Sequence, residues 1–151
     1  MQSTPVFSPG VIEEPVSAMI QEALAADSRF DSADSLWDAT ATVVADGQYR
    51  NVPPRFAAIG PGGQVAVTSS RLEVRQSVVW VFLEYRWVSG REGEGIREGM
   101  ATLVLVPLPD RPGWRIVHAH SSTGRSQLDF SPRTTPRIRS ARPGAKIRRT
   151  R

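Results

Sequence analysis

Two histidines, His118 and His120, carry most of the acid–base chemistry available to this chain, because its 151 residues include no other histidine and no cysteine. They end the stretch Trp-Arg-Ile-Val-His-Ala-His-Ser, which is typical of a β-strand. Side chains alternate along a strand, so both imidazoles are predicted to share one face. Three uses remain open, namely structural hydrogen bonding, general acid–base work in a pocket, and two ligands of a metal site. Because no third ligand is aimed at this strand, we expect no metal.

Glu84 and Arg86 interrupt an otherwise apolar stretch and are predicted to share a strand face with Trp80 and Phe82. A buried charge is costly unless it is paired. The two side chains therefore either face a polar pocket or lie in a structural ion pair across the sheet. We favour the pair, with Arg97 or Glu98 as the cross-strand partner.

Aromatic side chains form a second group of candidates. Most are expected in the core or in a dimer interface, but some could line a pocket for an apolar ring. Arg55 follows Pro53-Pro54 and could hold a carboxylate at the mouth of such a pocket, or it could be a solvated loop residue. The predicted ligand-binding residues are Trp37, Tyr49, Arg55, Phe56, Trp80, Glu84 and Met100.

The charge is unevenly distributed. The formal net charge is +4, yet residues 131–151 hold eight of the basic residues and no acidic one, which leaves the rest of the chain at about −4. This last stretch is poor in apolar residues and is predicted to be a disordered Arg-rich tail. It has no aromatic residue for base stacking, so we expect nucleic acid to bind only weakly, if at all, through phosphate contacts.

The order of predicted elements indicates an α+β fold, with helices packed on a curved antiparallel sheet. Residues 1–11 are predicted to form a flexible arm, residues 12–130 one domain, and residues 131–151 the tail. The predicted helices cover Glu13–Ala26 and Ser32–Trp37, with a helical turn at 53–59; the predicted strands cover Ala39–Ala45, Gln48–Val52, Gln64–Gln76, Ser77–Ser89 and a terminal hairpin within 96–123. Ser77–Ser89 is almost wholly apolar, which predicts a strand covered on both faces, with a partner chain as one candidate cover.

Several classes of protein and site are not expected. No run of about 18 apolar residues is present, so no membrane span is predicted. The first ten residues lack the features of a secretory signal, so a cytoplasmic protein is the default expectation. Gly60-Pro61-Gly62-Gly63 lacks the Lys-Ser/Thr of a phosphate loop and is interpreted as a turn. We expect no cofactor.

Taken in order, these features resemble the nuclear transport factor 2-like superfamily, and especially its SnoaL-like and kinase-association-domain branches. The resemblance covers residues 12–123. It depends on the helical opening, a Trp before the first strand, and the Thr-Val-Val-Ala-Asp-Gly turn at 42–47. Its most specific part is the hairpin that joins Ala101–Leu105 to Gly113–Ser122.

The resemblance implies a cone-shaped sheet with a largely apolar pocket at its mouth, and dimers that form through the sheet. It implies first a small-molecule-binding domain for an apolar or cyclic ligand. The alternatives are an isomerase, cyclase or dehydratase (lyase) that uses His118 or His120 as acid or base, and a dimerisation scaffold with a basic recruitment tail. Relatives often carry a pocket arginine before the Thr of the penultimate strand, whereas this chain has Gly99-Met100-Ala101-Thr102.

Overall fold

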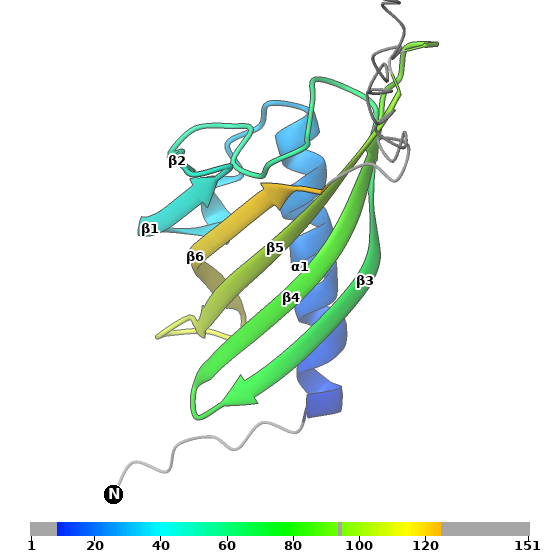
Figure 1. Cartoon of the computed structure of the whole chain (residues 1–151). Helices are drawn as coiled ribbons and strands as arrows, with labels where there is room; N and C mark the ends of the chain where they lie inside the picture. Colours follow the sequence, from blue (N-terminus) through cyan, green and yellow to red (C-terminus); the bar gives the residue numbers. More distant parts are fainter. Residues whose placement is uncertain (1–8, 94, 125–151) are drawn as a thin grey trace, which may run out of the picture.

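A computed structural model describes residues 9–93 and 95–124, so the Arg-rich tail and residues 1–8 lie outside the described residues (Figure 1). One long helix lies against a six-stranded, curved and open sheet. The predicted α+β class is confirmed. The elements are α1 Pro9–Ser28, the 3₁₀ helix η1 Asp34–Leu36, β1 Trp37–Ala45, β2 Gln48–Tyr49, β3 Gln64–Arg75, β4 Val78–Val88, β5 Ile96–Pro107 and β6 Trp114–Thr123.

Helix α1 forms because its apolar residues recur at helical spacing. Val16, Ile20, Ala23 and Leu24 lie on one face and are at most 4% exposed. The helix begins at Pro9, four residues before the predicted start and within the stretch expected to be an arm. It therefore continues through Pro15, whose nitrogen has no proton to donate to the preceding turn.

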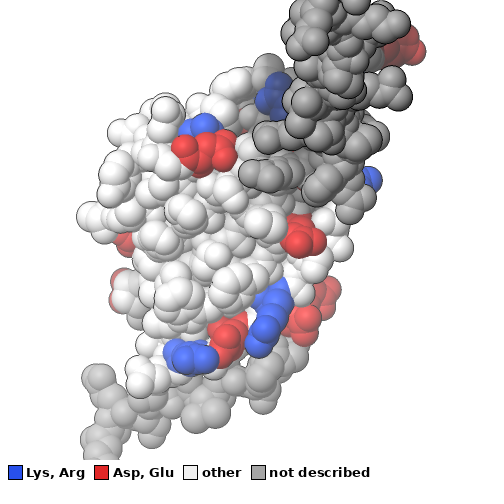
Figure 2. Space-filling view, viewed as in Figure 1, with Lys and Arg blue, Asp and Glu red and all other residues white. Residues whose placement is uncertain are grey.

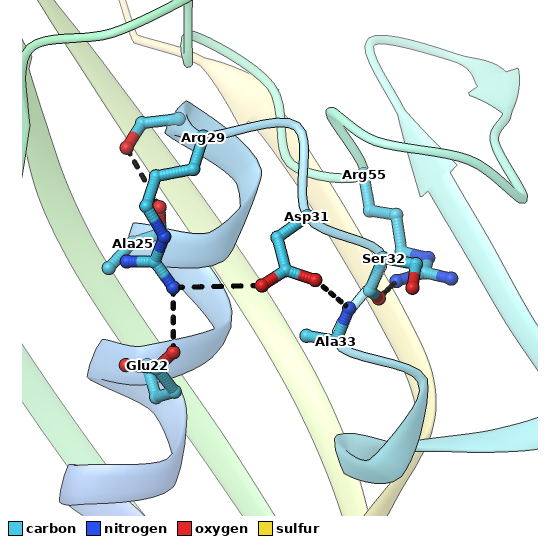
Figure 3. A network of polar contacts seen from close by, with 8 residues as sticks. Glu22, Ala25, Arg29, Asp31, Ser32, Ala33 and Arg55 are labelled. Carbon is cyan, nitrogen blue, oxygen red and sulfur yellow. Dashed lines mark hydrogen bonds and ion pairs between the residues drawn. The ribbon is translucent and has the colours of Figure 1, made fainter.

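A short polar network follows the end of α1 and links it to the next elements (Figure 3). Arg29 pairs with Glu22 at 2.8 Å, and Asp31 accepts a hydrogen bond from the Ala33 backbone at 3.1 Å. Arg55 donates to the carbonyl of Ser32. The Arg29 pair is half exposed and adds little stability, so the link from Arg55 is the one that holds this segment inward.

The predicted helix Ser32–Trp37 is wrong. Only the single 3₁₀ turn of η1 forms, capped by Ala33 in the left-handed conformation at φ 46°. Trp37 instead begins β1, where it is buried and pairs with Ile116. Burial of a large aromatic side chain outweighs the weak helix preference of so short a segment.

The sheet order is β2-β1-β6-β5-β4-β3. All neighbours are antiparallel except β1 and β6, which are parallel, so the expected purely antiparallel sheet is corrected to a mixed one. The Asp46-Gly47 turn joins β1 to β2 with both residues at positive φ, as the sequence predicted. Strand β2 is shorter than expected, and 53–59 forms bends and turns rather than a helical turn.

Strand β4 shows a strict alternation of buried and exposed residues. Its odd-numbered residues face α1 and the core, while Trp80, Phe82 and Glu84 point away from the helix. The face of the sheet turned away from α1 is called the outer face below, and the other the inner face. In the single chain β4 is therefore covered on one face, whereas the sequence predicted cover on both.

Candidate functional site

The inner face is filled with aromatic side chains. The rings of Phe56 and Trp37 lie 5.7 Å apart, and those of Phe56 and Tyr85 lie 6.2 Å apart with an edge-to-face angle of 75°. Phe56, Tyr85 and Trp87 are at most 1% exposed. Gly99 lies beside the Tyr85 ring, where any Cβ would overlap it. The centre of the fold is thus occupied by its own side chains.

A buried polar cluster ties the loop after β2 to this core. Asp27, near the end of α1, accepts a hydrogen bond from the Phe56 backbone at 2.7 Å. The Tyr85 hydroxyl donates to the Ala57 carbonyl at 2.5 Å, and the Ser121 hydroxyl accepts from the Ala57 amide at 2.9 Å. No buried side-chain polar atom among the described residues lacks a partner, which is the pattern of a structural cluster.

Burial shifts the pKa values in this cluster. Desolvation raises the pKa of Asp27 to about 6, although hydrogen bonds from the backbone of Arg55 and Phe56 oppose the shift. Burial likewise raises the pKa of the Tyr85 phenol. Because the folded protein favours protonated Asp27, its stability is expected to fall as pH rises from about 4 through about 6.

Asp27→Asn removes this titration and keeps an oxygen that can accept from Phe56. The stability of the variant relative to the unsubstituted chain should increase by on the order of 2 kcal/mol between about pH 4 and pH 7. Free energies of unfolding from denaturant titrations at several pH values measure this difference. Parallel curves for the two proteins would show that Asp27 has an ordinary pKa in the fold.

Arg55 is an internal residue, only 7% exposed. Its guanidinium lies 4.9 Å from the centre of the Trp37 ring, donates to the Ser32 carbonyl and pairs with Asp34 at 3.3 Å. Arg55, Trp37 and Asp34 border a cavity of about 410 Å³ against the inner face of β1, where small alanine side chains leave room. Trp37 and Arg55 are therefore brought together, as the pocket hypothesis required.

The histidines lie on the outer face. His118 is half-buried opposite Val104, and His120 is exposed opposite Thr102. No group of three or more potential metal ligands of the His, Cys, Asp or Glu type occurs among residues 9–93 and 95–124. His120 borders a hollow of about 400 Å³ on the outer face, together with Glu84 and Met100.

The remaining predicted site residues divide between the two faces. Trp80 is 41% exposed on the outer face, on the opposite side of the sheet from Phe56 and Trp37. Tyr49 is 84% exposed on the edge strand β2. The seven residues predicted to bind a ligand thus do not converge on one site.

The predicted cross-strand ion pair forms for Arg86, whereas Glu84 borders the hollow on the outer face instead. Arg86 lies opposite Glu98 in the β4–β5 register, and the two side chains pair at 3.0 Å. Arg97, the other proposed partner, lies instead over the Trp87 ring at 4.9 Å. A second pair, Arg115 with Asp38 at 3.3 Å, joins β6 to β1, and the pKa of Asp38 is lowered mainly by a hydrogen bond from the Thr40 hydroxyl.

The sequence analysis did not identify the buried polar cluster around Asp27, Tyr85 and Ser121. It did not name Arg71 as a candidate site residue either. Asp27 follows a helical apolar pattern without interrupting it, and Ser121 was considered only as a neighbour of His120. The one available signal was Tyr85 within a strand of alternating apolar residues, because a buried phenol needs a partner. Arg71 lies on the outer face of β3 and borders the same hollow as Glu84.

Solved structures of other proteins have a similar fold. A candidate dehydratase of the nuclear transport factor 2-like family from Streptomyces avermitilis superposes with a TM-score of 0.60 at 19% identity, over 79% of this chain and 100% of the other. The chain adopts the nuclear transport factor 2-like fold. A nuclear transport factor 2-like protein of unknown function from Shewanella baltica gives 0.55 at 12% identity, over 80% and 100% of the two chains.

The association domain of C. elegans CaMKII shares the nuclear transport factor 2-like fold too, with a TM-score of 0.56 at 17% identity, over 76% of this chain and 97% of the other. No protein-family model matches the chain, and no curated protein matches it. At these identities the likeness shows the fold alone.

Within the described residues, no helix has the length and apolar character needed to span a membrane.

Proposed function

We propose that this chain is a homodimerising association module whose contact surface is the outer face of the sheet. The observation that carries the proposal is a group of three large apolar side chains on adjacent strands. Trp80, Phe82 and Met100 are 41%, 47% and 51% exposed. Grouped exposure of this kind is typical of an interaction surface rather than of a solvated sheet.

The surroundings of these three residues support a protein partner. Figure 2 looks onto the outer face and shows a broad uncharged area over β6, β5 and β4, with charged side chains in small groups around it. An apolar centre with a polar rim is the usual anatomy of an interface. The similarity to a protein named as an association domain favours a second copy as the partner.

The packing of the inner face also favours an association module over an enzyme. An enzyme or ligand-binding protein of this fold needs polar groups that converge in an open interior. Here Phe56, Tyr85 and Trp87 fill the centre of the interior, and the polar groups next to them are engaged with backbone atoms. The space that remains lies at its margins, beside β1 and between α1 and strands β3 and β4. Both histidines lie on the other side of the sheet.

A second candidate function is the binding of a small apolar or cyclic ligand. The cavity beside β1 favours it, because the ring of Trp37 and the small side chains of Ala39 and Ala41 line about 410 Å³ of space. Arg55 at its wall could hold a carboxylate if Asp34, which is exposed, moved aside. Binding here would be independent of the outer face.

Hydroxyl-radical footprinting of the full chain tests the proposed dimer surface. The side chains of Trp80, Phe82 and Met100 should become protected as the protein concentration rises through the dissociation constant. Phe30, which is 54% exposed just beyond α1, provides the internal control and should react equally at all concentrations. The proposal would be contradicted if the reactivity of each of the four side chains stayed the same at every protein concentration.

A further inference from the structure

Two oppositely charged side chains on the outer face have no partner among residues 9–93 and 95–124. In the described part of the chain, the side chains of Arg71 and Glu84 take part in no hydrogen bond or ion pair, although both border the same hollow. Most neighbouring charges are engaged. The pairs observed among the described residues are Arg29 with Glu22 and Asp31, Asp34 with Arg55, Asp38 with Arg115, Glu73 with Arg75, and Arg86 with Glu98.

The strand register fixes where these two charges lie. Arg71 on β3 is directly opposite Phe82 on β4, and Ser69 is directly opposite Glu84. Arg71 and Glu84 are therefore diagonal neighbours, about 8 Å apart at the backbone for ordinary strand and residue spacings. Phe82 lies beside both charges on the outer face, because it is opposite Arg71 and two residues before Glu84 on β4.

We propose that a second copy of the chain docks on the outer face in one register, in which Arg71 of each copy pairs with Glu84 of the other. This rests on the proposed homodimer and specifies its geometry. A two-fold rotation relates the two copies. Its axis runs between the two sheets and parallel to them, and in projection it crosses the line from Arg71 to Glu84 at its midpoint and at a right angle. A two-fold interface of this kind satisfies both charges twice with the same contact.

The same axis also aligns the apolar residues. With strands about 4.8 Å apart and alternate residues about 6.8 Å apart, it passes within about 2 Å of Phe82, so that this ring meets its own copy. Trp80 lies one step further along β4, and Met100 lies opposite Glu84 on β5. The rotation brings Trp80 of one copy to within about 4 Å, in projection, of Met100 of the other.

This register accounts for the two unpaired charges beside the apolar side chains of the outer face. A charge buried in an interface without a partner is strongly unfavourable, so registers that leave Arg71 or Glu84 unmatched are disfavoured. The other charged side chains of this part of the outer face already pair within the chain, Glu73 with Arg75 and Arg86 with Glu98. Arg71 and Glu84 are therefore the charges that select the register.

Charge exchange tests the proposal in the full chain. Arg71→Glu and Glu84→Arg should each weaken self-association at least about tenfold, because each places like charges opposite one another. The double variant exchanges the two charges and should restore the dissociation constant to within about threefold of the original. Arg29→Glu, just beyond the end of α1, makes the same change in net charge as Arg71→Glu and should leave association unchanged.

The outcomes separate this inference from the proposed function. If the double variant associates no better than either single variant, the Arg71–Glu84 register is overturned, while a dimer of the unsubstituted chain still supports the association module. If the unsubstituted chain does not self-associate, both proposals are overturned. Circular dichroism and thermal melting of each variant confirm that loss of association is not loss of folding.

Discussion

Replacing Phe82 by Glu is expected to leave the full chain monomeric at concentrations where the unsubstituted chain is a dimer. Phe82 is 47% exposed at the centre of the outer face, so the substitution removes no core contact. In the dimer, however, it would bury a carboxylate against an apolar surface. An uncompensated charge of this kind costs about 3–5 kcal/mol, which is a hundredfold or more in the dissociation constant.

The matched control is Phe30→Glu. Phe30 is exposed to a similar degree, at 54%, but lies just after α1 and not on the outer face. The same chemical change there should leave the dimer intact. Sedimentation equilibrium of both variants gives their association constants, and equal constants for the two would show that the outer face is not the contact surface.

Replacing Phe56 by Ala is expected to lower the free energy of unfolding by about 3–5 kcal/mol. Phe56 is fully buried and packs against Trp37 and Tyr85. Its removal leaves a cavity that the surrounding strands cannot close, because they are held in register on both sides of the site. Such a loss is a large part of the total stability of a domain this size.

Denaturant titration measures this effect, with Phe30→Ala as the control for loss of an exposed phenylalanine. The control should change the free energy of unfolding by no more than about 0.5 kcal/mol. A small effect of Phe56→Ala would mean that the interior is loosely packed. That result would contradict the filled core and favour the ligand-binding alternative.

Patterns within single segments were enough to predict the class of the fold. The spacing of Val16, Ile20 and Leu24 indicated α1, and Asp46-Gly47 indicated the first hairpin turn. The start of β1 was misplaced because a tertiary contact decides it. Trp37 joins a strand rather than a helix since its ring packs against Phe56, and no local pattern encodes that contact.

Assigning residues to faces was harder for a physical reason. Alternation showed that Trp80, Phe82, Glu84 and Arg86 share one face of a strand, and the structure agrees. Both faces of β4 are rich in apolar residues, so alternation alone could not indicate which face meets α1. Trp80 was therefore grouped with Trp37 and Phe56, from which the sheet separates it.

The parallel pairing of β1 with β6 also lay beyond local reasoning. Thr42 pairs with His118 and Val44 with His120, between strands that are about 75 residues apart in the chain. This pairing puts β6 in the interior of the sheet and sets the histidines on the outer face. The Trp114–Ser122 sequence shows only that the two histidines share one face of the strand. It does not show which face of the sheet that is.

Sedimentation equilibrium of the full, unsubstituted chain tests the central claim most directly. The proposal predicts a mass that rises with concentration from that of one chain to that of two, with the transition at micromolar concentrations or below, as for interfaces of ordinary size. A mass that stays at the monomer value of 16.6 kDa up to about 100 µM would contradict it. The outer face of the sheet would then be no surface for self-association.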